Sequence, residues 1–179
     1  MRKLPICLLA LSACAFGQEN PLVKSFKGEF DLVKGLLTRS ADKVSDADYD
    51  FKATKDVRSF GQIIVHVADA QYTFCSAASG EKSPATGSVE KTKTTKADLV
   101  AALKEAFAYC DKVYDGLTDA TAAQTIKFFG RDTTKLGVLA FNNMHDMEHY
   151  GNLVTYMRLK NIVPPSSEPR PQASPQDKK

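Results

Sequence analysis

The chain has 179 residues, and its 24 Lys and Arg against 21 Asp and Glu give a formal net charge of +3. Apolar residues make up 43% of the sequence and Trp is absent, so a globular core must be filled by ten Phe and six Tyr. No basic stripe stands out along the sequence, which argues against nucleic acid as a partner. The length suits one domain between an N-terminal leader and a C-terminal tail.

The N-terminus has the features of a signal peptide, which we predict over residues 1–17. Arg2 and Lys3 precede the apolar run LPICLLAL, and the triplet AFG fits the small-x-small rule for cleavage after Gly17. The run is too short for a permanent membrane anchor. The sequence LSAC also fits a lipoprotein box, in which Cys14 would become the lipid-modified first residue. We therefore expect a periplasmic or secreted protein that is anchored to a membrane only if Cys14 is lipidated.

Four segments after the leader carry the apolar period of helices. They are expected over about 21–39, 59–80, 95–116 and 135–160, and Ser59-Phe60-Gly61-Gln62 matches a capping box. The fourth segment is apolar on more than one face, which predicts the most buried helix. Its aromatic and methionine residues are accordingly assigned to the core: Phe141, Met144, Met147, Tyr150, Tyr156 and Met157.

The connections and the tail complete the predicted fold. The aromatic, Gly-broken segment QTIKFFGRDTT is expected to be an extended loop over one end of the bundle. Residues 164–179 hold five of the eight prolines and are predicted to be a disordered tail. No convincing strand is present in the sequence. The prediction is an all-α, four-helix-bundle domain over residues 20–163.

The three histidines of the chain all lie in apolar helical segments. His145 and His149 are spaced i, i+4 and so lie on one helix face, and His66 is at the centre of another apolar stripe. Three neutral imidazoles suit one divalent ion such as zinc or nickel, with a coordination position left open. Nearby polar residues could accept hydrogen bonds from the outer ring nitrogens: Asp69, Asn142 and Glu148.

Other interpretations of these residues remain open. All three histidines could be core residues with a structural role only. HDMEH also matches the inverted zincin pattern, with Glu148 as a general base, but the only later glutamate is Glu168 in the tail. A Cys-His enzyme is disfavoured because Cys75 lies about 180° around the helix from His66, and because Cys110 lies on a core stripe.

Two motifs resemble the DinB-like superfamily of metal-binding four-helix bundles. They are RSFGQIIVHVADAQYTFC and NNMHDMEHYGNLVTYMRLKNIVPP, and the resemblance extends over residues 22–165. It implies that His66, His145 and His149 are the metal ligands. It also implies that the middle two helices run parallel and are joined by a long crossover.

The resemblance implies a class of activity as well. Some members are similar to thiol S-transferases and others to metal-dependent hydrolases or a maleylpyruvate isomerase. We therefore expect a metal-dependent hydrolase or thiol-transferase-like enzyme that acts on a small molecule. The alternative is a non-catalytic protein that binds a metal or a small ligand, and a homodimer is considered with it. Low-molecular-weight thiols are scarce outside the cytoplasm, which disfavours thiol transfer by an exported member.

Cys75 and Cys110 test the parallel arrangement. In an antiparallel pair of helices their Cα atoms would lie roughly 16 Å apart along the axis, whereas parallel helices bring both to the same end. The 16 residues from Ser79 to Thr94 can span up to about 53 Å, which is enough to cross a helix about 28 Å long. A disulfide is therefore feasible, and two buried free thiols are the alternative.

Overall fold

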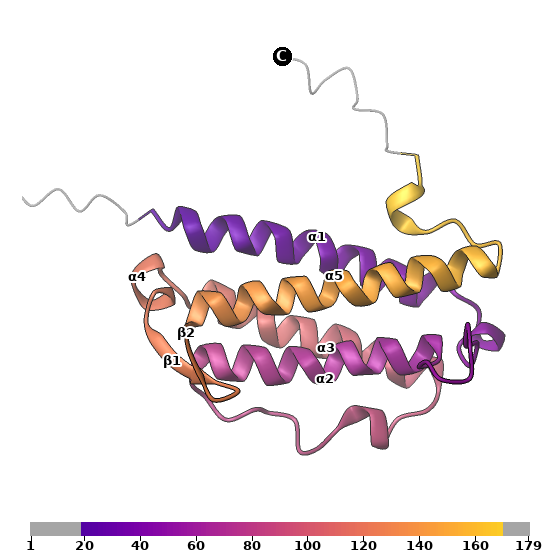
Figure 1. The fold of residues 1–179 in the computed structure, drawn as a ribbon, viewed down its shortest axis with the longest axis horizontal. Helices are drawn as coiled ribbons and strands as arrows, with labels where there is room; N and C mark the ends of the chain where they lie inside the picture. The colour runs from indigo at the N-terminus through magenta and orange to yellow at the C-terminus, as the bar shows by residue number, and fades with distance from the viewer. Residues whose placement is uncertain (1–18, 170–179) are drawn as a thin grey trace, which may run out of the picture.

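The computed structural model describes residues 19–169, and four long helices dominate it (Figure 1). They are α1 (Pro21–Lys43), α2 (Phe60–Ser79), α3 (Lys96–Asp115) and α5 (Lys135–Leu159). The shorter elements are α4 (Asp119–Ala122), the strands β1 (Thr125–Phe128) and β2 (Arg131–Thr134), and 3-10 turns at Asp46–Asp48, Val89–Lys91 and Pro165–Ser167. The predicted signal peptide over 1–17, with Cys14, and residues 170–179 of the predicted tail lie outside the described residues.

The helices α2 and α3 run parallel, and residues 80–95 cross back along the bundle between them (Figure 1). At their N-terminal ends, a Cβ built on Gly61 would lie 3.0 Å from Tyr49 and 3.1 Å from Leu99, so glycine permits this close approach. At their C-terminal ends, Cys75 is joined to Cys110. The predicted all-α four-helix bundle with a long crossover between its second and third helices is confirmed.

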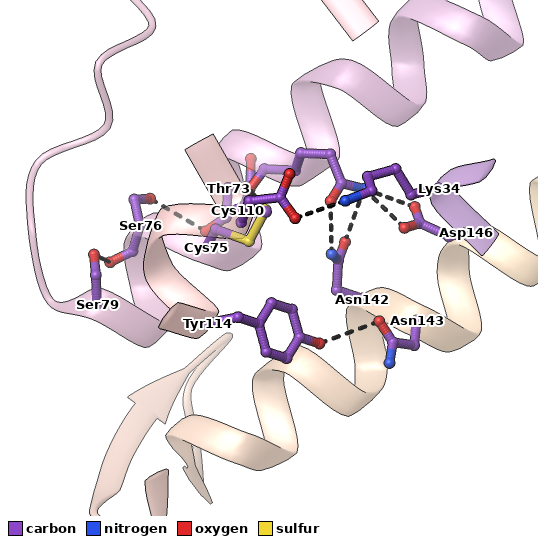
Figure 2. The surroundings of a disulfide bond; sticks show 12 residues. Lys34, Thr73, Cys75, Ser76, Ser79, Cys110, Tyr114, Asn142, Asn143 and Asp146 are labelled. Carbon is purple, nitrogen blue, oxygen red and sulfur yellow. Dashed lines mark hydrogen bonds and ion pairs between the residues drawn. A yellow bond between two sulfur atoms is a disulfide. The ribbon is translucent and has the colours of Figure 1, made fainter. Parts of the chain in front are cut away.

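The disulfide lies inside the bundle (Figure 2). The Cα atoms of Cys75 and Cys110 are 5.4 Å apart, and both side chains are fully buried. This separation is within the range that a disulfide requires. Of the two alternatives for these cysteines, the bonded pair is the one in the structure.

The N-terminal ends of α2 and α1 are capped in two different ways. The Ser59 hydroxyl accepts a hydrogen bond from Gln62 N, and the Gln62 side chain accepts one from Ser59 N, so the predicted capping box is confirmed. The start of α1 is capped from elsewhere in the chain. The Asp119 carboxylate accepts hydrogen bonds from the backbone N–H groups of Leu22 and Val23, at 3.1 and 2.9 Å.

The core is continuous along the bundle and is largely apolar. Phe30, Ile64, Leu103 and Leu139 are among its fully buried side chains. No helix within residues 19–169 is long and apolar enough to cross a lipid bilayer.

The segment expected to be an extended loop is an antiparallel hairpin at the end of the bundle where α5 begins (Figure 1). Its two turn residues, Phe129 and Gly130, both have positive φ angles, 47° and 77°, as a two-residue hairpin turn requires. The Phe128 ring packs 5.5 Å from the Phe74 ring, measured between centroids. The expectation of no strand was wrong because two four-residue strands are too short to show an alternating pattern.

The assignment of the α5 methionines and aromatics to the core was half wrong. Tyr150, Tyr156 and Met157 are buried, but three others are exposed by 47, 62 and 48%: Phe141, Met144 and Met147. Polar residues occupy part of the inner face in their place. A helix that is apolar all round does not reveal which side faces the core.

The bundle continues beyond residue 163, where the domain was expected to end. Pro165 is buried, and Ser166 N donates a hydrogen bond of 2.9 Å to the Tyr150 hydroxyl. The Glu168 carboxylate forms ion pairs with two basic side chains of α1. The prediction of disorder was therefore wrong for residues 164–169, because these contacts tie them to α1 and α5.

Candidate metal centre

The three histidines converge between α2 and α5. The Nε2 atom of His145 lies 3.2 Å from that of His66 and 3.1 Å from that of His149. One ring nitrogen from each residue lies within 4.8 Å of the others. The i, i+4 pair thus comes from α5, and α2 supplies the third ring opposite it. The structure brings together all three residues that the sequence analysis selected.

The centre is at the edge of the core and is partly open to solvent. His149 has 9% of its surface exposed, and the His145 side chain has 15%. On one side the Phe74 ring contacts His145, with centroids 5.5 Å apart, and forms an apolar wall. The rings are therefore not completely shielded from solvent.

The surroundings favour neutral rings. Burial, together with the smaller effects of the neighbouring His145 and His66, lowers the pKa of His149 to about 4. Burial also lowers the pKa of His66, followed by the nearby Arg58 charge. Neutral imidazole is the form that binds metal. The lowered pKa values keep these rings neutral, so protons compete less with a metal ion for the ring nitrogens.

The donor set fits a divalent cation. The Nε2 atom of His145 is at hydrogen-bond distance from those of His66 and His149. A neutral ring that carries its hydrogen on Nδ1 has only a lone pair at Nε2, and a shared cation removes the repulsion between such lone pairs. The outer nitrogen of His145, Nδ1, is buried and lacks a hydrogen-bond partner. Three imidazoles without thiolates suit borderline ions such as zinc and nickel. His66, His145 and His149 are the residues that would hold the ion.

The polar residues expected to support the rings have other partners. Asp69 accepts hydrogen bonds from Ser88 Oγ at 2.6 Å and Val89 N at 2.7 Å, so it fastens the crossover to α2. The Asn142 amide donates to Gln71 Oε1 at 2.8 Å. The third residue, Glu148, is exposed.

The structure also argues against the inverted zincin interpretation, which requires two carboxylates at the metal. Glu148 is exposed to solvent beside the buried His149. Glu168 forms ion pairs with Arg39 at 3.3 Å and Lys43 at 2.6 Å. Neither glutamate is therefore placed as that motif requires.

The sequence analysis missed a buried carboxylate next to the centre. Asp146 is fully buried and accepts from Gln71 Nε2, with distances of 2.7 and 3.0 Å to its two oxygens. Burial raises its pKa to about 6, although the interaction with His145 and then the Gln71 hydrogen bonds oppose this. Its Oδ1 atom is 3.9 Å from His145 Nδ1. The available signal was a charged residue within the apolar fourth helix, one position after a histidine.

The fold and the site agree with the comparison to protein families. The model of the DinB superfamily matches residues 29–153, and the chain belongs to this superfamily. Among curated proteins, the chain is similar to the uncharacterized protein YjoA of Bacillus subtilis (strain 168). The two are 26% identical over 145 residues, which is 79% of this chain and 90% of YjoA.

Solved structures share the fold. A DinB-like protein from Bacillus cereus ATCC 10987 has a TM-score of 0.70 at 16% identity, covering 79% of this chain and 95% of that one. The DinB-like YjoA structure from Bacillus subtilis has a TM-score of 0.62 at 22% identity, covering 85% and 100%. A conserved protein from Enterococcus faecalis has a TM-score of 0.61 at 13% identity, covering 76% and 95%. At these identities the likeness concerns the fold alone.

Proposed function

We propose that this protein binds one divalent metal ion through His66, His145 and His149 and uses it to act on a small molecule. The observation that carries the proposal is the convergence of three Nε2 atoms, two pairs of which are 3.1 and 3.2 Å apart. A bound zinc or nickel ion lowers the pKa of a coordinated water or thiol and so supplies a nucleophile at neutral pH.

Charged groups near the centre support a reactive role over simple metal storage. Arg58 Nε lies 3.5 Å from the Glu90 carboxylate, and the charges of both residues act on the pKa of His66. Charged side chains near a metal ion can orient a polar substrate. We therefore propose a metal-dependent hydrolase, with thiol transfer as the second chemistry and non-catalytic ligand binding as the alternative.

The test is elemental analysis of tag-free protein, followed by a screen of ester, amide and lactone substrates. The proposal predicts about one equivalent of zinc or nickel and metal-dependent turnover that is lost in His66→Ala. About one equivalent of metal without turnover would favour the binding alternative. Protein that neither retains nor takes up these metals would overturn the proposal.

We also propose that the protein is exported. The signal-like N-terminus is one support. A buried disulfide between Cys75 and Cys110 is a second, because structural disulfides are typical of oxidising compartments. Mass spectrometry of protein from its own cell should find a chain that begins at Gln18, or at a lipidated Cys14. An intact N-terminus would contradict export and would restore thiol transfer to equal standing.

A further inference from the structure

His145 has a buried nitrogen that needs a partner. If Nε2 binds a metal, the single hydrogen of the neutral ring must be on Nδ1, which then becomes a donor. That atom is buried without a hydrogen bond in the structure. A carboxylate oxygen, Asp146 Oδ1, lies 3.9 Å from His145 Nδ1. A shift of about 1 Å would bring the pair to the distance of a charge-assisted hydrogen bond.

Asp146 is itself held firmly from α2. Gln71 Nε2 lies 2.7 and 3.0 Å from the two carboxylate oxygens and 3.3 Å from Asn142 Oδ1, while Asn142 donates back to Gln71 Oε1. All three side chains are fully buried. Within residues 19–169, the Gln71 amide nitrogen is the donor at hydrogen-bond distance from this carboxylate, which can accept about four hydrogen bonds. Asp146 keeps acceptor capacity on the side of His145.

The backbone of Gln71 is fixed as well. Its carbonyl oxygen lies 3.4 Å from Cys110 Sγ, so the amide that holds Asp146 belongs to the part of α2 that the disulfide joins to α3. Figure 2 shows Asn142 and Asp146 near the Cys75–Cys110 bond. A rigid support of this kind can fix the direction of a ring that it contacts.

We propose that Asp146 is a positioning residue: its carboxylate accepts a hydrogen bond from His145 Nδ1 and thereby presents the Nε2 lone pair to the metal. This inference rests on the proposed metal site. Gln71 holds the carboxylate in place, and Asp146 does not touch the ion. The structural alternative is that Asp146 only ties α5 to α2 through Gln71.

Asp146→Asn tests the proposal, because it keeps the volume but removes the charge and places an amide next to the ring. The affinity for Zn²⁺, measured by competition with a chromophoric chelator, should fall about 10- to 100-fold. The visible spectrum of bound Co²⁺ should change too. Asn143→Ala is the matched control: Asn143 is buried on the same helix but bonds Tyr114 and Phe26, so its loss should lower stability and leave Zn²⁺ affinity unchanged.

A measurement on the unaltered protein keeps the proposal testable if Asp146→Asn does not fold. In ¹⁵N NMR spectra of the Zn²⁺-loaded protein, His145 Nδ1 should carry a hydrogen with the shift of a strong hydrogen bond to a carboxylate. Normal Zn²⁺ affinity in folded Asp146→Asn, or an Nδ1–H without that shift, would overturn the inference but leave the metal site. Unaltered protein that binds no Zn²⁺ would instead overturn the proposed function on which the inference rests.

Discussion

The helix α2 has two different interfaces, and the contrast separates stability from chemistry. Toward α3 it is apolar and covalently closed: Gly61 lies against Leu99 and Cys75 is bonded to Cys110. The interface between α2 and α5 contains histidine, glutamine, asparagine and aspartate side chains, and the three imidazole rings converge at its edge. The first interface provides most of what a stable bundle needs, whereas the second keeps costly polar groups inside the protein.

Buried polar groups contribute little net free energy even when they are satisfied, but they define geometry closely. The Gln71–Asn142–Asp146 network satisfies its own amides and fixes the carboxylate near His145. An apolar interface of the same shape would be as stable or more so. The proposed metal site would account for the polar interface.

Breaking the α3 interface should have the largest effect on stability. Replacing both Cys75 and Cys110 by Ala opens a loop with a sequence separation of 35, which should lower the free energy of unfolding by about 3–4 kcal/mol. The melting temperature should fall by roughly 10 °C. Urea titration of both proteins, with and without reductant, measures this. An unchanged midpoint would show that the disulfide does not stabilise the bundle.

Breaking the α5 interface at the rings should affect affinity more than folding. His66→Ala, His145→Ala and His149→Ala should each weaken Zn²⁺ binding by more than the roughly 10–100-fold expected from loss of an outer partner. His66 and His145 are partly exposed, so their replacement should change the melting temperature without metal little, whereas replacement of the buried His149 should lower it more. Calorimetric titration with Zn²⁺ checks this prediction. Equal affinity in any one variant would remove that residue from the ligand set.

A change of pH should act on stability through the interface with α5, which contains the buried titratable groups His149 and Asp146. Because the pKa of His149 is about 4 in the folded chain against an ordinary 6.5, the unfolded chain takes up this proton first, and stability is lost as pH falls from about 6.5 toward 4. Asp146 acts oppositely: its pKa is raised from 3.8 to about 6, so its contribution is lost as pH rises through that range. Without metal the two slopes oppose each other.

Metal binding should depend on pH in one direction only. Ligand imidazoles must be neutral, so Zn²⁺ affinity should fall as pH drops through about 6. The increase in melting temperature caused by Zn²⁺ should accordingly be large at pH 8 and small at pH 5. An equal increase at both pH values would count against imidazole ligands.

The outer face of α5 should give the smallest change in stability. Met144 and Met147 are exposed by 62 and 48%, so Met144→Lys and Met147→Lys should alter the free energy of unfolding by no more than about 0.5 kcal/mol. If the homodimer considered in the sequence analysis formed through this face, both variants should elute as monomers with light-scattering detection. A mass unchanged from that of the original protein would argue against this face as the interface.

The sequence predicted the frame of the fold well because its signals are periodic and local. The ends of α2, α3 and α5 follow from capping residues and apolar spacing, and the crossover follows from family resemblance. The hairpin was missed because its strands, Thr125–Phe128 and Arg131–Thr134, are short and mostly polar. Residues 164–169 were missed because proline content does not reveal that Glu168 meets Arg39 and Lys43.

The convergence of the three histidines was predictable from the sequence, and the groups that surround their outer nitrogens were not. The i, i+4 spacing of His145 and His149 is a local signal, and apolar surroundings single out His66. The partner of a ring nitrogen, in contrast, depends on how two helices pack. Proximity in the sequence had favoured Asp69 as a partner of a ring nitrogen. In the structure Asp69 instead bonds the crossover, and Asp146 lies next to His145.

The most direct test of the metal site is zinc K-edge X-ray absorption of protein loaded with one equivalent of Zn²⁺. The account predicts three imidazole nitrogens at about 2.0–2.1 Å, with the outer-ring scattering typical of histidine, and one oxygen ligand such as water. The same spectrum from His145→Ala should lose part of the imidazole scattering. A first shell of oxygen alone, or one that contains sulfur, would contradict a centre made by His66, His145 and His149.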